Sequence, residues 1–364
     1  MGRKLRARWF RASCQIGYLR VSARAPAARG RALVVRAPGE VGLEPRETPV
    51  PAPGELLFEP ELVGLCGTDL EVIGGTIDPA YVRYPVVIGH EWTGRVAAGP
   101  GPAGSPPAGA RVAVEGIVYC GRCPRCRAGD TNVCESFTEI GFSRDGAAAR
   151  HVAAPLRQAH VLTPGVSAQD AALIEPASVV FRALDRAGVT PGCRALVVGD
   201  GTVALLGAYL LGLWSPAEIT VLGRREMQAD LAIRAGAAAF VTGLPAVGTG
   251  FDLVVEAAGT ADAAGTAFAA ARRGGTVVLL GLPPHGEPAP VSPGDLVTRD
   301  LRIVASFSYT SRAWETVVRL VNAGRLRPGF LVTHCFALRD WEAALATLRG
   351  TDGPRGKVLL RIGD

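Results

Sequence analysis

Four cysteines within one short segment constrain the fold of this chain more than any other feature. Cys120, Cys123, Cys126 and Cys134 are interleaved with Gly, Pro and Arg, which prevents a regular helix or strand from running through the segment. Four thiolates commonly hold a tetrahedral structural zinc ion, whereas disulfides between cysteines this close together would be strained. Nothing else in the chain indicates an oxidising compartment. The segment therefore predicts a structural zinc site, with two disulfides as the alternative.

A second group of metal-binding side chains precedes this loop. Cys66 lies in the run Gly-Leu-Cys-Gly-Thr-Asp at 64–69, and His90 and Glu91 lie in the run Gly-His-Glu at 89–91. One thiolate, one imidazole and one carboxylate suit a zinc ion that keeps an open coordination position. The alternative is that the cysteine is a small buried residue and the histidine a core residue. The flanking glycines indicate tight turns rather than core packing, which favours the metal site.

In this order, these motifs resemble those of the zinc-dependent medium-chain alcohol and polyol dehydrogenases, and the resemblance covers residues 31–364. It implies an α/β fold that combines a GroES-like β-barrel catalytic domain with a Rossmann domain containing a doubly wound parallel sheet. The catalytic domain would comprise 31–177, with 325–364 returning to it, and the nucleotide-binding domain would comprise 178–324. Catalysis is expected in the cleft between them.

The first thirty residues differ in composition from the rest of the chain. The formal net charge is +6, but residues 1–30 contain eight Arg or Lys and no Asp or Glu, so 31–364 carry a net charge of −2. We expect 1–30 to be a dispensable, disordered extension, with a weak targeting segment or translation from an upstream start as alternatives. The remainder is not a basic nucleic-acid binder, and the apolar run at 203–214 is too short to cross a membrane. A cytoplasmic enzyme is the expectation.

A glycine turn separates a predicted buried strand at 194–198 from a predicted helix. Gly199, Gly201 and Ala204 occupy the three positions of the dinucleotide-binding fingerprint. The first position permits the turn, the second lets the backbone approach a pyrophosphate, and the third allows close packing of helix on strand. Further strands are predicted at 251–256, 276–280 and 302–305, and the spacing fits a six-stranded doubly wound sheet.

The end of the next predicted strand, 218–222, distinguishes between the two nicotinamide cofactors. NAD-binding chains place Asp or Glu there to bind the ribose 2′-hydroxyl. This chain has Gly223, Arg224 and Arg225 instead, and two guanidinium groups can pair with a 2′-phosphate. We therefore predict NADP(H) rather than NAD(H). The alternative is that both arginines are solvated residues that precede a helix at 226–235.

The resemblance also implies the composition of the catalytic metal site. Cys66 and His90 are the expected zinc ligands, and carboxylate ligands come from Glu91 and Glu175, either directly, through water or in alternation. The Glu175-Pro pair is similar to the polyol, sugar and threonine dehydrogenases, whereas the alcohol-dehydrogenase branch has a cysteine there. A charge at the start of a helix is the alternative explanation of Glu175. Asp69 is expected to orient His90 by accepting its ring N–H.

The expected reaction is the zinc-dependent, NAD(P)-linked interconversion of a secondary alcohol (a polyol, sugar or cyclitol) and its ketone by hydride transfer. Thr68 is placed to carry the proton away, and Glu71 stands where several related alcohol dehydrogenases have a histidine. One alternative is a threonine or simple-alcohol dehydrogenase, and another is a non-catalytic zinc-binding relative. The resemblance implies a homodimer or homotetramer in which Rossmann sheets pair edge to edge near 277–282.

Overall fold

The computed structural model describes residues 29–99, 101–243, 247–283, 288–289 and 291–363. The expected N-terminal extension lies outside the described residues, except for Arg29 and Gly30, which begin the first strand. Among the described residues, no helix combines the length and the hydrophobicity that crossing a lipid bilayer requires.

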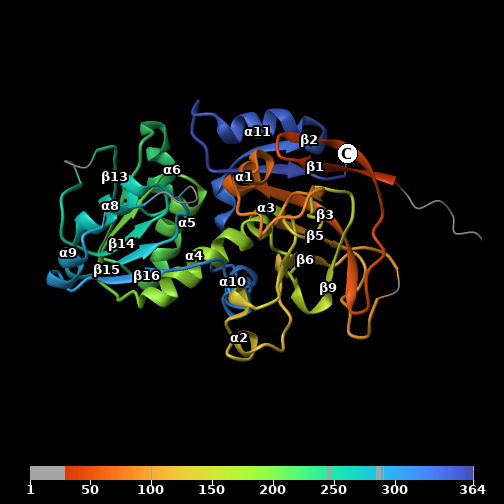
Figure 1. The fold of residues 1–364 in the computed structure, drawn as a ribbon, viewed down its shortest axis with the longest axis horizontal. Helices are drawn as coiled ribbons and strands as arrows, with labels where there is room; N and C mark the ends of the chain where they lie inside the picture. The colour runs from red at the N-terminus through yellow and green to blue at the C-terminus, as the bar shows by residue number, and fades with distance from the viewer. Residues whose placement is uncertain (1–28, 100, 244–246, 284–287, 290, 364) are drawn as a thin grey trace, which may run out of the picture.

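The catalytic half, at the right of Figure 1, is built around a seven-stranded sheet. Its strand order is β10-β6-β5-β3-β18-β17, and β9 also pairs with β3. The strands are β3 (Glu55–Leu65), β5 (Glu91–Val96), β6 (Arg111–Val114), β9 (Val152–Pro155), β10 (Ala159–Val161), β17 (Val332–Ala337) and β18 (Lys357–Arg361). Because β18 pairs antiparallel with β3, the end of the chain returns to the sheet formed near its beginning.

Two small sheets and four helices complete this half. Strands β1 (Arg29–Ala37), β2 (Glu40–Glu47) and β4 (Val86–Val87) form one sheet, and β7 (Ile117–Val118) pairs with β8 (Thr138–Glu139). The helices are α1 (Gly67–Gly74), α2 (Pro124–Arg127), α3 (Ala168–Ala172) and α11 (Trp341–Arg349). Buried side chains from the sheets, among them Phe58 and Trp92, form the core of this half.

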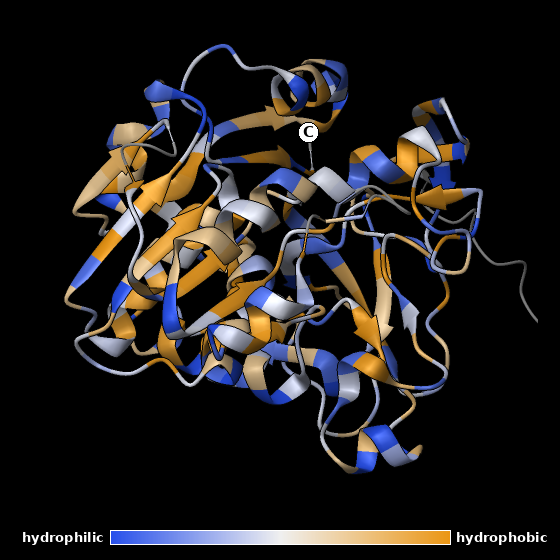
Figure 2. Ribbon diagram, turned by 60° about the vertical axis from the view of Figure 1, so that its left-hand side comes forward, coloured by the Kyte–Doolittle hydropathy of each residue, from blue (hydrophilic) through white to orange (hydrophobic). Residues whose placement is uncertain are grey.

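The nucleotide-binding half contains a six-stranded, all-parallel sheet, which confirms the predicted doubly wound fold. The strand order is β13-β12-β11-β14-β15-β16. The strands are β11 (Arg194–Val198), β12 (Glu218–Leu222), β13 (Ala239–Val241), β14 (Phe251–Glu256), β15 (Ala271–Leu279) and β16 (Arg302–Ala305). Helices on both faces bury these apolar strands, whose hydrophobic residues are apparent in Figure 2.

The helices of this half are α4 (Ile174–Ala187), α5 (Thr202–Leu211), α6 (Ala229–Arg234), α8 (Ala261–Ala270), α9 (Pro293–Thr298) and α10 (Ser311–Asn322). The helix expected at 226–235 is a 3-10 turn at Glu226–Gln228 followed by α6. Helices α4 and α10 lie where the two halves meet (Figure 1). There, the buried Tyr309 hydroxyl accepts the Gly116 N–H at 2.8 Å and joins the two halves.

Candidate metal and nucleotide sites

Pairing between β3 and β5 brings the first group of predicted metal ligands together. Gly64 of β3 lies opposite Glu91, the first residue of β5, and Cys66 follows shortly after Gly64 as the N-cap of α1. The Cys66 sulfur, a His90 ring nitrogen and a Glu91 carboxylate oxygen lie within 4.8 Å of one another. These donors can hold one divalent metal ion, and zinc accepts all three types.

Close packing fixes the turn that carries His90. Gly89 has a φ of +101°, and a Cβ atom there would lie 2.7 Å from Val63 Cγ1 and 2.9 Å from the Ala148 nitrogen, so only glycine fits. His90 is buried, and its Nδ1 lies 3.4 Å from Oδ1 of Asp69. This arrangement leaves Nε2 as the nitrogen available to a metal, as in histidine ligands oriented by a carboxylate.

A buried lysine that the sequence analysis missed lies beside Glu91. Nζ of Lys357, the first residue of β18, forms an ion pair with Oε2 of Glu91, and both side chains are 2% exposed. Burial would lower the pKa of Lys357, but the negative charges of Glu91, Cys66 and Glu175 and the hydrogen bond to Glu91 together outweigh this effect and raise it. Lys357 is therefore charged at neutral pH and neutralises Glu91. A lysine directly before the apolar run Val-Leu-Leu of β18 was the available signal.

Two further carboxyl groups lie beside this metal-binding group. Glu175, in the first turn of α4, is 8% exposed, and burial together with the charge of Glu91 raises the pKa of its carboxyl to about 8. It is not among the donors that converge within 4.8 Å. Glu139, at the end of β8, has a pKa raised by burial to about 7 and interacts electrostatically with His90. The sequence analysis missed Glu139 because no motif surrounds it.

Thr68 and Glu71 extend from the metal-binding group along α1. The Thr68 hydroxyl lies 3.7 Å from the Cys66 sulfur. Glu71 is half-buried and follows three residues later, so both side chains lie on one face of the helix. Burial raises the pKa of the Glu71 carboxyl. The Thr68 hydroxyl and the Glu71 carboxyl, which can both exchange protons, therefore lie in succession along α1, and Thr68 is the nearer of the two to the metal-binding group.

The four cysteines of the loop around α2 converge on one point. Their Sγ atoms lie within 4.8 Å of one another, and the Cys120–Cys126 and Cys123–Cys134 sulfur separations are both 4.0 Å. A disulfide bond is about 2 Å long, so the alternative of two disulfides is wrong. The N–H groups of Arg122 and Cys123 donate to the Cys120 sulfur and lower the pKa of this thiol to about 6. Four thiol donors so arranged suit a structural zinc ion.

The turn after β11 has the geometry of a dinucleotide-binding loop. Gly199 has a φ of +128°, Gly201 is the N-cap of α5, and Ala204 in the first turn of α5 is fully buried. The N-terminus of α5 therefore lies at the carboxyl edge of the parallel sheet, where its free N–H groups can bind a pyrophosphate.

The two arginines after β12 differ in their surroundings. Gly223 is buried and donates its N–H to β13, and Asp200 accepts the N–H groups of both Arg224 and Arg225 at 2.9 and 3.0 Å. The Arg225 guanidinium also pairs with Asp200 at 2.8 Å. Burial would raise the pKa of Asp200, but these hydrogen bonds outweigh it and lower the pKa. Arg224 is exposed, and no described residue forms an ion pair with its side chain.

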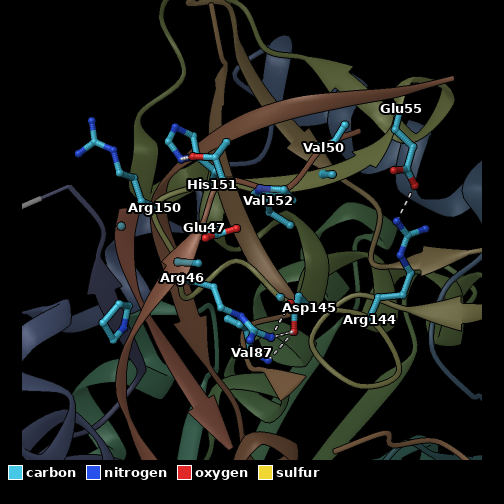
Figure 3. A pocket seen from close by; sticks show the side chains of 17 residues that line it. Arg46, Glu47, Val50, Glu55, Val87, Arg144, Asp145, Arg150, His151 and Val152 are labelled. Atoms are coloured by element: carbon cyan, nitrogen blue, oxygen red, sulfur yellow. Dashed lines mark hydrogen bonds and ion pairs between the residues drawn. The ribbon is translucent and has the colours of Figure 1, made fainter. Parts of the chain in front are cut away.

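A polar pocket elsewhere on the catalytic half is separate from these sites (Figure 3). Its lining contains two ion pairs, Arg46 with Asp145 at 2.9 Å and Arg144 with Glu55 at 2.5 Å. None of the predicted metal-binding or nucleotide-binding residues lines this pocket. The two candidate sites therefore lie outside it.

Comparison with known families identifies both halves of the chain. Residues 52–164 match the alcohol dehydrogenase GroES-like domain, and 198–323 match the zinc-binding dehydrogenase domain. The L-galactonate-5-dehydrogenase of Escherichia coli K12 is 32% identical over 313 residues, which cover 83% of this chain and 90% of that relative. This chain belongs to the zinc-dependent medium-chain dehydrogenases, in the polyol and threonine dehydrogenase branch. It is an alcohol or polyol dehydrogenase that acts on a small molecule.

Two solved structures share this architecture. A zinc-binding dehydrogenase of Sinorhizobium meliloti 1021, bound to NADP, is 28% identical with a TM-score of 0.84, covering 92% of this chain and 99% of that chain. An alcohol dehydrogenase of E. coli CFT073, complexed with NADH, is 26% identical with a TM-score of 0.85, covering 92% and 100%. The GroES-like and Rossmann architecture is confirmed, and the enzyme uses zinc and a nicotinamide cofactor. A non-catalytic role is therefore not retained.

Proposed function

We propose that this enzyme interconverts a secondary alcohol of a polyol, sugar or cyclitol and the corresponding ketone, with NADP(H) as the cofactor. The observation that carries this proposal is the convergence of Cys66, His90 and Glu91 within 4.8 Å, beside Glu175. The name of the relative L-galactonate-5-dehydrogenase, which denotes a polyhydroxylated sugar acid, supports this substrate class.

In this proposal Cys66, His90 and Glu91 hold the catalytic zinc ion, with Glu175 as a further carboxylate ligand or water-binding group. A bound zinc ion would supply a Lewis acid that favours loss of the substrate hydroxyl proton, and a bound nicotinamide would supply the hydride acceptor. Thr68 takes the proton through its hydroxyl, and Glu71 follows on the same face of α1. Cys120, Cys123, Cys126 and Cys134 hold a second, structural zinc ion.

The polar groups around the metal-binding residues favour a polyhydroxylated substrate. Glu139 and Glu175 have pKa values of about 7 and 8, so each can donate or accept a hydrogen bond near neutral pH. Hydroxyl groups beside the reacting carbon can bind the buried Glu175 and the half-buried Glu139. A simple aliphatic alcohol offers these carboxyl groups no such partner.

The nucleotide contacts are assigned from the turns after β11 and β12. Gly199, Gly201 and Ala204 allow the pyrophosphate to approach the N-terminus of α5. Gly223 leads into Arg224, whose exposed guanidinium we assign to the 2′-phosphate, while Arg225 holds the turn in place through Asp200.

The assembly and the domain limits are also part of the proposal. We retain 31–177 with 325–364 as the catalytic domain and 178–324 as the nucleotide-binding domain, in a cytoplasmic homodimer or homotetramer. Strand β15, which includes much of the region expected at the subunit interface, is paired on both sides within one chain, whereas β16, next to it, is the edge strand at that end of the sheet. We therefore expect sheets to associate through β16, and a monomer in light scattering would contradict this assembly.

The substrate assignment is tested by following nicotinamide reduction with purified enzyme. Polyols, cyclitols, sugar acids, L-threonine and primary alcohols are compared, each with NADP and with NAD. We expect the highest kcat/KM for a polyhydroxylated secondary alcohol with NADP, and loss of this activity in Cys66→Ser. Faster oxidation of L-threonine or of simple alcohols would contradict the substrate class, and a preference for NAD would contradict the role of Arg224.

A further inference from the structure

A fully buried glutamine bridges the nucleotide-binding turn and the catalytic half. Gln228 lies at the end of the 3-10 turn that follows Arg225, and its side chain is 0% exposed. Its Nε2 donates to the carbonyl oxygens of Asp200 and Arg355 at 2.6 and 2.7 Å, and its Oε1 accepts the Arg355 N–H at 2.7 Å. One side-chain amide therefore binds both backbone polar groups of Arg355 and the turn of the dinucleotide fingerprint.

Other contacts hold the same two segments together. The Thr202 hydroxyl, at the start of α5, donates to the Gly356 carbonyl oxygen at 3.1 Å. The Arg355 guanidinium donates to carbonyl oxygens at the end of α11, including that of Gly350 at 2.8 Å. The segment at 355–356 is thus fixed to the nucleotide-binding turn on one side and to the catalytic half on the other.

This segment leads directly to the metal-binding group. Gly356 donates its N–H to the Thr333 hydroxyl at 3.1 Å, and a Cβ atom at Gly356 would lie 2.0 Å from the Leu331 carbonyl oxygen, so this segment packs directly against the backbone at Leu331. The next residue is Lys357, whose ammonium pairs with Glu91. Only Gly356 separates Arg355, whose backbone Gln228 holds, from Lys357, the cation that neutralises a predicted metal ligand.

We propose that Gln228 is a positioning residue that couples nucleotide binding at the 199–201 turn to metal retention at Cys66, His90 and Glu91. It does so by fixing Arg355 and, through the backbone, the position of Lys357 against Glu91. Pyrophosphate binding would fix the position of the turn. Gln228 would in turn fix Arg355 and thereby Lys357 beside the metal-binding group. This coupling rests on the proposed function. Because coupling between two ligands is reciprocal in binding free energy, nucleotide binding should raise the affinity for zinc as zinc binding raises the affinity for the nucleotide. We expect the more tightly bound zinc ion to leave more slowly.

The test is the rate at which a chelator removes zinc, with and without saturating NADPH. In the wild-type enzyme we expect NADPH to slow loss of the more labile zinc by about tenfold, within the usual range of coupling between sites. Gln228→Met keeps the size of the side chain but removes all three hydrogen bonds, and we expect the protection to fall below about twofold. Gln228→Glu, which keeps the acceptor and removes the donors, is the second variant if the first does not fold.

The matched control is Gln158→Met. Gln158 is also 0% exposed, and its amide donates to the Ile117 carbonyl oxygen within the catalytic half. This control should lose stability yet keep the protection by NADPH, because a merely structural effect does not change the coupling. Equal protection in the wild type and Gln228→Met would overturn the coupling while leaving the proposed function intact. Failure of the wild type to bind NADPH in a fluorescence titration would overturn both.

Discussion

The ion pair between Lys357 and Glu91 yields the sharpest stability prediction. Both side chains are 2% exposed, so Lys357→Met would leave Glu91 as a buried carboxylate without its cation. Breaking a buried pair in this way costs about 3–5 kcal/mol. For a unit of roughly 150–250 residues, each kcal/mol lowers Tm by about 2–4 °C. We therefore expect Tm to fall by roughly 6–20 °C.

The assay is thermal unfolding of the metal-free enzyme at neutral pH, followed by circular dichroism, so that no zinc ion replaces the lysine cation beside Glu91. The control is Arg272→Met, which breaks the Arg272–Asp252 pair, whose side chains are 49% and 31% exposed. An exposed pair contributes about 0–1 kcal/mol, so this variant should unfold close to the wild type. The reasoning would be refuted if Lys357→Met lowered Tm no more than Arg272→Met does.

Three further predictions concern the nucleotide and metal sites. Arg224→Ala should weaken NADPH binding by about tenfold or more and leave NADH binding unchanged, because it removes a charged hydrogen bond to the 2′-phosphate; fluorescence titration measures both. Gly89→Ala should displace His90 and reduce the metal content from two ions per chain to one, as counted by atomic absorption, because the added Cβ has no room. Asp200→Asn should reduce stability at neutral pH, and its difference from wild type in denaturant unfolding should shrink below about pH 4. The sign follows from the lowered pKa of Asp200 in the folded protein. Its contribution to the free energy of unfolding is present above the pKa of this carboxyl in the unfolded chain, and it is lost as the pH falls through the pKa in the folded protein.

The metal-binding residues were predictable because each lies in a local motif. Cys66 is the N-cap of α1, and His90 follows Gly89, whose positive φ favours glycine. The type and spacing of these residues therefore predicted that they converge. Glycine turns are local features, and the alternation of strands and helices that follows them likewise predicted a six-stranded doubly wound sheet.

Long-range pairings were not predictable by the same reasoning. Lys357 and Glu91 meet because β18 and β5 both pair with β3, and no local pattern relates a lysine at the end of the chain to a carboxylate near its beginning. Asp200 was part of the fingerprint, but its pairing with Arg225 depends on how β11 and β12 lie side by side. That pairing distinguishes the two arginines, which the sequence treated alike. Arg225 is paired with Asp200, whereas Arg224 is exposed.

The central claim is that one chain holds a catalytic zinc ion beside an NADP(H) site. Metal analysis of the wild type and Cys66→Ser, combined with NADPH binding to each, tests it most directly. We predict two zinc ions per chain in the wild type, one in Cys66→Ser, and NADPH binding by the wild type. One zinc ion in both proteins would contradict the assignment of Cys66 and the account of catalysis built on it.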